Sequence, residues 1–414
     1  MTLDPIHVEN IARLAYGIAG DVDTTDHDDL AGRVWRDWLP ELRRDGRVVI
    51  EPVGDHERRL APVDDAALAE RPFETVHGLD SGTINPTTFK NGLVVDVAHA
   101  AMASEPTDLD LHRDRTIVAT VHAGDSTADF DDDWRKRDDG HTRQRVLHAP
   151  RVNRYAEGVV HALALYLAEG THALDHADEV DDLLVLDGPI YPKELFTWDD
   201  RNPELGALAR EAKPRAVVEK YVRLVERFVE RDVPLIGFIK NSGSSAITRA
   251  VRDKTNAPWA NDNAFFNRVL ARRDDEGDLR TGALTFTNWF HSRVGTDRIV
   301  ADDALGIERA LDPELYEVTF FVVYDPRDDL CYRVEAPYAF TRDEELRERL
   351  RMQVLHEVAA EQGPPLAVAK ADELARIDAG ANEQLRRRIE RELDSERHRE
   401  YDDKRWGVDV DEMV

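Results

Sequence analysis

The chain has 414 residues, and its 84 acidic and 55 basic side chains give a formal net charge of -29. With one cysteine, Cys331, the chain cannot form an internal disulfide bond. The sequence also has no apolar run of about 18 residues, the length needed to span a membrane. We therefore expect a cytoplasmic protein of a reducing compartment with no membrane partner. The acidity is typical of adaptation to high salt, and it leaves nucleic acid open as a ligand because phosphate binding depends on local charge.

Residues 1–73 are expected to form an N-terminal extension of helices and loops. Apolar residues recur at helical spacing over 6–18 and over 30–39, where Pro40 ends the second helix. Exposed apolar faces on these helices would suit a partner interface.

From residue 74 onwards the sequence alternates between strand-like and helix-like segments. Short apolar runs bounded by turn residues predict strands, and longer runs with a period near 3.6 predict helices. The predicted order is β-β-β-α-β-α-β, with segments at 74–80, 92–101, 116–122, 152–168, 183–187, 214–231 and 234–240. This is the order of a ribonuclease H-like core, an α/β fold in which helices flank both faces of a mixed five-stranded sheet.

The C-terminal half is expected to extend this core. Residues 316–324 and 330–336 predict a hairpin, and helices are expected over 342–361 and 366–397. In domain terms, we expect an extension (1–73), then one domain over 74–378 made of a core (74–240), a loop-rich insertion (241–312) and a C-terminal part (313–378), and finally a charged helix and tail (379–414).

Two aspartates end strand-like runs. Asp80 follows TVHGL and precedes Ser-Gly-Thr, and Asp187 follows LLVL and precedes Gly-Pro. Either one alone is also a common turn residue. In a ribonuclease H-like sheet, however, the first and fourth strands are neighbours, so both carboxylates would emerge side by side. Converging carboxylates bind Mg2+ or Mn2+, and such ions hydrolyse phosphodiesters, so we predict a metal site on these two residues.

A third metal ligand is expected from the helix between these strands, at Glu157 or Glu169. We favour Glu157 because it stands at the edge of the helix's apolar stripe, where a buried carboxylate needs a partner. Glu169 precedes Gly170 and resembles a helix end. Lys240, at the end of the fifth strand, is expected to hold a scissile phosphate or balance the carboxylates, and is equally consistent with a solvated lysine.

Five motifs, taken in order, resemble the NurA family of DNA repair nucleases over residues 74–378. They are GLDSGT around Asp80, LLVLDGPIY around Asp187, PLIGFIKNS around Lys240, YRVEAP at 332–337 and GPPLAVAKADELARI at 363–377. The resemblance implies a ribonuclease H-like fold, a Mn2+ cofactor with Mg2+ as the alternative, and 5'-to-3' exonuclease and single-strand endonuclease activities on DNA. It also implies a homodimer that works with the hexameric translocase HerA in DNA end resection during double-strand break repair.

Carried over by motif, Asp80 and Asp187 match the family's metal-binding aspartates. Glu157 matches the family's helix glutamate less closely, because residues 171–182 form an apparent insertion.

The last motif departs from the family at two positions. The family usually has a tyrosine and a histidine where this chain has Pro364 and Asp372. An aspartate can replace histidine as a ligand to a hard metal ion, so Asp372 is expected to join the metal site. Pro364 has no hydroxyl, and Tyr332 and Tyr338 are the candidates to supply one.

Further alternatives stay open at the sequence level. Arg333 is expected either to pair with Glu335 and fix the hairpin or to reach DNA phosphate. Residues 79–83 also resemble the first phosphate loop of the actin and sugar kinase ATPases. The departures at Pro364 and Asp372 would suit a non-catalytic subunit that docks on DNA or HerA.

Overall fold

The computed structural model of the chain describes residues 4–21, 27–123, 130–150, 154–198, 205, 208–302 and 304–398. Within these ranges, the backbone alone is described at residues 18–21, 27–28, 150, 154–157 and 379. The helices so described include none that is long and apolar enough to cross a membrane.

In the part of the chain that the structure describes, one mixed sheet has 14 strands, so the expected sheet of five strands is only its centre. The order is β1-β2-β12-β13-β14-β10-β9-β4-β5-β6-β8-β7, and β11 joins β13 to β3. The strands are β1 (Leu42–Arg44), β2 (Arg47–Pro52), β3 (Arg58–Pro62), β4 (Val76–Thr88), β5 (Val94–Glu105), β6 (Arg115–Ala123), β7 (Arg135–Arg137), β8 (Thr142–Pro150), β9 (Leu183–Asp187), β10 (Leu235–Ile239), β11 (Ala283–Thr287), β12 (Phe290–Ser292), β13 (Val318–Asp325) and β14 (Leu330–Pro337).

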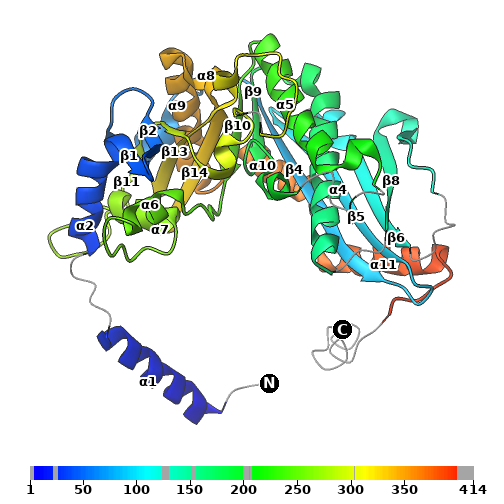
Figure 1. Cartoon of the computed structure of the whole chain (residues 1–414), viewed down its shortest axis with the longest axis horizontal. Helices are drawn as coiled ribbons and strands as arrows, with labels where there is room; N and C mark the ends of the chain where they lie inside the picture. Colours follow the sequence, from blue (N-terminus) through cyan, green and yellow to red (C-terminus); the bar gives the residue numbers. More distant parts are fainter. Residues whose placement is uncertain are drawn as a thin grey trace.

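Helices cover both faces of this sheet. Helix α1 is an exception, because it lies apart from the sheet in Figure 1, and its residues Ile11 and Leu14 are exposed. The expected helix over 366–397 is two helices, because the chain turns at 376–378 and the Asp378 side chain caps the second one. The α-helices are α1 (Pro5–Asp21), α2 (His27–Arg33), α3 (Val63–Leu68), α4 (Arg154–Asp175), α5 (Pro214–Glu230), α6 (Ala246–Arg252), α7 (Asp262–Leu270), α8 (Tyr338–Thr341), α9 (Glu344–Glu361), α10 (Leu366–Ala375) and α11 (Ala379–Glu392).

The centre of the sheet contains the predicted strands in the order β6-β5-β4-β9-β10. The first three pair antiparallel, whereas β9 runs parallel to β4 and β10 runs parallel to β9. The first three predicted strands thus form an antiparallel meander, and the predicted contact between the strands that carry Asp80 and Asp187 is confirmed.

The prediction that a strand ends at Asp80 was wrong. Strand β4 continues to Thr88, and Asp80 lies opposite Ala101 of β5. Strand β9, by contrast, pairs with β4 only as far as Leu79, opposite Leu186. The segment after Asp80 stays extended because β5 continues to supply hydrogen-bond partners on one side. Asp80 is thus the first residue of β4 beyond its pairing with β9.

The extension and the insertion are also parts of the sheet rather than helices and loops alone. Strand β2 pairs with β12, and β3 pairs with β11. Both insertion strands then pair with β13. These strands lack a clear apolar alternation; β3, for example, is exposed at four of its five residues. Their pairing is non-local, which a local pattern does not reveal.

Helices α4 and α10 sandwich strand β4. Figure 1 shows α4 lying across β4, β5 and β6, with α5 packed beside it. Successive strand residues point to opposite faces, and Ser81 reaches α4 while Gly82 meets α10. A Cβ atom at Gly82 would lie 1.8 Å from the carbonyl oxygen of Ala375, and one at Gly78 would lie 2.3 Å from the backbone of Ala367. The two glycines thus allow α10 to rest directly on β4.

Candidate active site

Asp80 and Asp187 meet at the end of the parallel β4–β9 pair. They directly follow Leu79 and Leu186, the last residues of the two strands that pair with each other. The negative charge of Asp187 raises the pKa of Asp80, so the two carboxyl groups lie within electrostatic reach of each other. The Lys240 ammonium, just beyond β10, donates a hydrogen bond to Asp187 Oδ2 at 2.7 Å. The predicted convergence of the two aspartates is present, and Lys240 balances their charge.

A cavity of about 250 Å³ opens beside this pair. Because β9 ends at Asp187 while β4 continues, side chains from both faces of β4 line it. Its polar side chains come from β4, β9, α4 and α5, and its apolar ones flank them. The lining residues are Leu79, Asp80, Ser81, Leu165, Tyr166, Glu169, Leu186, Asp187, Pro189 and Tyr221.

Glu169 is the α4 glutamate that the structure brings to this cavity. Ser81 Oγ donates to Glu169 Oε1 at 2.5 Å, and the Tyr221 hydroxyl donates to Glu169 Oε2 at 2.9 Å. Glu157 lies twelve residues earlier on α4, about 18 Å along the helix axis. Its side chain is outside the described residues. Gly170 did not mark a helix end, because α4 continues to Asp175.

Three carboxyl groups of the cavity have a raised pKa. Burial raises the pKa of Asp80 to about 7, and the negative charge of Asp187 adds to this rise. Burial also raises the pKa of Glu169 to about 7, against the opposing effect of its hydrogen bonds from Ser81 and Tyr221. Burial raises the pKa of Asp187, and Lys240 opposes that rise. The cavity therefore holds more negative charge than one lysine can balance.

Asp372 stands at the rim of the site. It lies on α10, which Gly78 and Gly82 hold against β4, and its negative charge contributes to the raised pKa of Asp187. Its carboxylate is 37% exposed and pairs with Arg376 at 2.5 Å. Asp372 thus interacts electrostatically with Asp187 from the face of the sheet opposite to the face where Glu169 lies.

The expectation that Arg333 contacts DNA is wrong. The side chain is 5% exposed, and its guanidinium donates to Glu335 at 2.7 Å and to Asp297 at 2.9 Å. Lys193 completes this buried network by pairing with the same two carboxylates. The alternative, that Arg333 pairs with Glu335 on the hairpin, is confirmed.

The hydroxyl groups of the cavity come from residues that the sequence did not single out. Tyr332 packs on Phe238, and Tyr338 packs on His291, so neither lines the cavity. Tyr166 and Tyr221 do line it. Tyr221 occupies an apolar position of α5, where a tyrosine is expected to be a core residue. Its hydroxyl was the only sign in the sequence of a role in the site.

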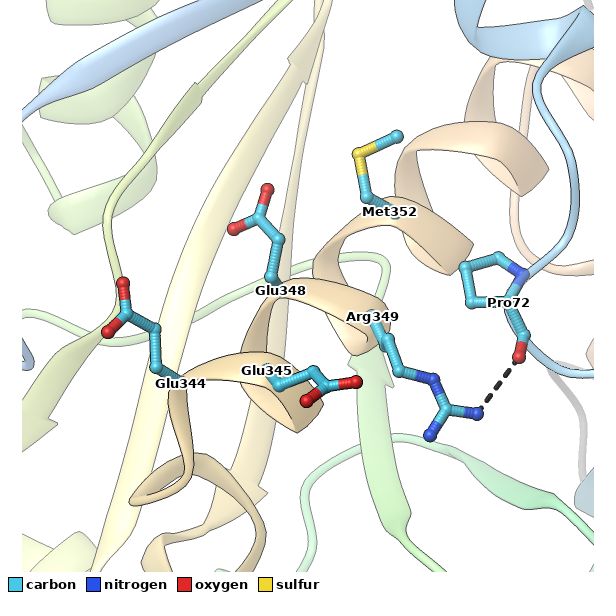
Figure 2. A pocket seen from close by; sticks show the side chains of 6 residues that line it. All are labelled: Pro72, Glu344, Glu345, Glu348, Arg349 and Met352. Atoms are coloured by element: carbon cyan, nitrogen blue, oxygen red, sulfur yellow. Dashed lines mark hydrogen bonds between the residues drawn. The ribbon is translucent and has the colours of Figure 1, made fainter.

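A larger hollow on the surface is a weaker candidate. Figure 2 shows it beside α9, where Glu344, Glu345, Glu348 and Met352 follow one another along the helix. Its volume is about 510 Å³, and the Arg349 guanidinium on its rim is bonded to the carbonyl oxygen of Pro72 at 3.0 Å. Its carboxylates all come from one surface helix, in contrast to the cavity at Asp80, where carboxylates from β4, β9 and α4 converge.

The donors of the cavity fit a divalent cation. Over the described ranges, no set of three or more histidine, cysteine, aspartate or glutamate side chains is arranged to hold a metal ion. The donors are nevertheless all carboxylates, which hard cations such as Mn2+ and Mg2+ prefer. The raised pKa values of Asp80 and Glu169 reflect buried carboxylates that lack positive charge. A cation would supply this charge in place of Lys240.

The fold and site together define an α/β protein with a carboxylate-lined cavity at the end of a parallel strand pair. The NurA domain model matches residues 74–377, and the chain belongs to the NurA family.

Solved NurA structures are similar to this chain at low sequence identity. The crystal structure of the NurA nuclease from Sulfolobus solfataricus is 13% identical, with 95% of this chain and 98% of that chain covered and a TM-score of 0.52. Structures of NurA with manganese and of NurA bound to dAMP and manganese are 8% and 9% identical, each with a TM-score of 0.43. The match to the manganese structure covers 93% of this chain and 97% of that chain, and the match to the dAMP and manganese structure covers 89% of this chain and 94% of that chain. The first likeness shows a shared fold. Curated proteins gave no match.

Proposed function

We propose that this chain is a metal-dependent nuclease that cuts DNA. The observation that carries the proposal is the meeting of Asp80 and Asp187 at the end of the β4–β9 pair, with Glu169 lining the same cavity. Membership in the NurA family supports it. The order and directions of β6-β5-β4-β9-β10 further support a ribonuclease H-like core within a nuclease domain over 74–378.

Asp80, Asp187 and Glu169 would hold Mn2+, with Mg2+ as the alternative, and Asp372 would be a further ligand at the rim. A divalent cation supplies Lewis-acid chemistry, because it polarises the phosphodiester and makes an attacking water more acidic. Asp80 and Glu169, each with a pKa of about 7, would give up their protons as the cation is bound.

The remaining side chains would handle the DNA. With a cation balancing Asp187, the Lys240 ammonium becomes available to a DNA phosphate oxygen. The apolar walls formed by Leu79, Leu165 and Leu186 would limit water in the cavity and so strengthen these electrostatic contacts. Arg333 takes no part, since its guanidinium is occupied in a buried network.

The finer activities rest on the family resemblance of the five motifs. We propose 5'-to-3' exonuclease and single-strand endonuclease activities, used in DNA end resection during double-strand break repair. A homodimer working with a HerA-type translocase is the proposed assembly. Helix α1, on which Ile11 and Leu14 are exposed, would be available to a partner.

A DNA degradation assay tests the proposal. Linear duplex and single-stranded DNA labelled at either end would be incubated with the protein in molar potassium chloride, with Mn2+ or with EDTA, and ATP hydrolysis would be followed in parallel. We expect Mn2+-dependent shortening from the 5' end and internal cuts in single strands. Equal degradation in EDTA contradicts the metal requirement, and ATP hydrolysis without degradation supports the kinase-like alternative.

A second function, a non-catalytic docking subunit, is favoured by one observation. Asp372 is paired with Arg376, and Pro364 supplies no hydroxyl. Intact DNA and no ATP hydrolysis in the same assay would support it. The ATPase alternative has less support, because residues 79–83 lie in a strand paired with β5 rather than in a phosphate-binding turn.

A further inference from the structure

Helix α5 places one polar side chain on its buried face. Its other buried residues there are apolar: Pro214, Val217, Val218, Val222, Leu224, Val225 and Phe228. Tyr221 is the exception, and its hydroxyl donates to Glu169 Oε2 at 2.9 Å. A buried hydroxyl within an apolar face is retained only where it finds such a partner.

Glu169 is held from two sides. Ser81 Oγ on β4 donates to one carboxylate oxygen at 2.5 Å, and Tyr221 on α5 donates to the other at 2.9 Å. One donor from the sheet and one from a helix therefore fix the direction of a carboxylate that lines the same cavity as Asp80 and Asp187. Hydrogen bonds of this kind set the orientation of metal-binding side chains in proteins.

Gly170 leaves space for the Tyr221 ring. A Cβ atom at Gly170 would lie 3.2 Å from Cε2 of the Tyr221 ring and 3.4 Å from Lys220 Cβ. The missing side chain thus lets the ring lie against α4 directly beside Glu169. The two hydroxyl donors to Glu169 come from β4 and α5.

We infer that Tyr221 is a positioning residue, which together with Ser81 directs the Glu169 carboxylate towards the Asp80–Asp187 pair for cation binding. This inference rests on the proposed metal-dependent function. Tyr221 acts through Glu169 and need not contact the DNA.

The test is Tyr221→Phe, with Mn2+ binding measured by calorimetry in the absence of DNA. Loss of a residue that orients a metal ligand should weaken Mn2+ binding about 10-fold or more. Tyr316→Phe is the matched control, because it removes a similar hydrogen bond, from the Tyr316 hydroxyl to Glu226 on the same helix, outside the cavity. It should leave Mn2+ binding within about twofold of the wild type. Equal weakening in both variants, or none in Tyr221→Phe, would overturn the inference.

A second variant covers the case in which Tyr221→Phe does not fold. Gly170→Ala presses on the Tyr221 ring while improving the helix propensity of α4. We expect weaker Mn2+ binding without a lower melting temperature, and unchanged binding would count against the inference. If the wild type binds Mn2+ no better than Asp80→Asn, the proposed function itself fails. If the wild type binds Mn2+ through Asp80 and Tyr221→Phe binds equally well, only the positioning role fails.

Discussion

The Lys240 ammonium lies 2.7 Å from Asp187 Oδ2, so the lysine that follows strand β10 neutralises the aspartate that ends the neighbouring strand β9. This ion pair lies beside Asp80, and burial raises the pKa of both Asp80 and Asp187. Lys240 thus supplies the positive charge that a bound divalent cation would supply to Asp187.

This relationship predicts opposite effects of Lys240→Gln on binding and on cleavage. Removing the ammonium should tighten Mn2+ binding several-fold, because a positive charge no longer competes for Asp187. DNA cleavage should nevertheless fall about 10-fold, because the phosphate contact is lost. Calorimetry and a cleavage assay on the same preparation measure the two effects. Weaker Mn2+ binding in the variant would show that Lys240 does not compete with the cation.

The raised pKa of Asp80 predicts a pH-dependent stability of the metal-free protein. The folded-state pKa is about 7 and the ordinary value 3.8, so the folded protein binds this proton more tightly than the unfolded chain. The resulting stabilisation is full below the ordinary pKa and is lost as the pH rises through 7. Asp80→Asn should therefore raise the free energy of unfolding by about 2 kcal/mol at pH 8 and by less at pH 5. Urea unfolding in EDTA measures this, and an equal gain at both pH values would refute the assignment.

Asp372 should contribute to metal binding from the α10 side. Asp372→Ala is expected to weaken Mn2+ binding about 10-fold and to slow DNA cleavage. Asp372→His should preserve both, because imidazole also binds Mn2+. The variant Arg376→Ala, which frees Asp372 from its ion pair, should not weaken Mn2+ binding. Full activity in Asp372→Ala would remove this residue from the site.

The contact of α10 with β4 should depend on Gly82. A Cβ atom there would lie 1.8 Å from the carbonyl oxygen of Ala375, so Gly82→Ala must displace the helix that carries Asp372. We expect a loss of about 3 kcal/mol in the free energy of unfolding, together with weaker Mn2+ binding. Gly243→Ala is the control, because a Cβ atom there meets nothing within 4 Å. Wild-type stability in Gly82→Ala would contradict this close packing.

The centre of the fold was predictable because its strands and helices are marked by patterns of residues that are close together in the sequence. Strand β9 occurs at the predicted residues 183–187, and β10 and α5 differ from prediction by one residue at their ends. Their apolar runs are continuous and end on Gly, Pro or charged residues. Strands β2 and β3 were missed because they form by pairing with β12 and β11, more than 200 residues away.

The site was predictable in part for the same reason. Asp80 and Asp187 end apolar runs, so the strand order alone brought them together. Glu169 was passed over because Gly170 resembled a helix end, whereas that glycine lies inside α4 and makes room for Tyr221. Asp372 approaches from α10, whose position against β4 depends on a tertiary contact at two glycines.

The most direct test of the central claim compares Asp187→Asn with Asp275→Asn. Both substitutions remove one negative charge, but Asp187 belongs to the aspartate pair and Asp275 lies exposed in the loop between α7 and β11. The measurement is the rate of Mn2+-dependent cleavage of end-labelled DNA. The account predicts a loss of at least about 100-fold for Asp187→Asn and a wild-type rate for Asp275→Asn. Equal cleavage by the two variants would contradict a nuclease site at this pair.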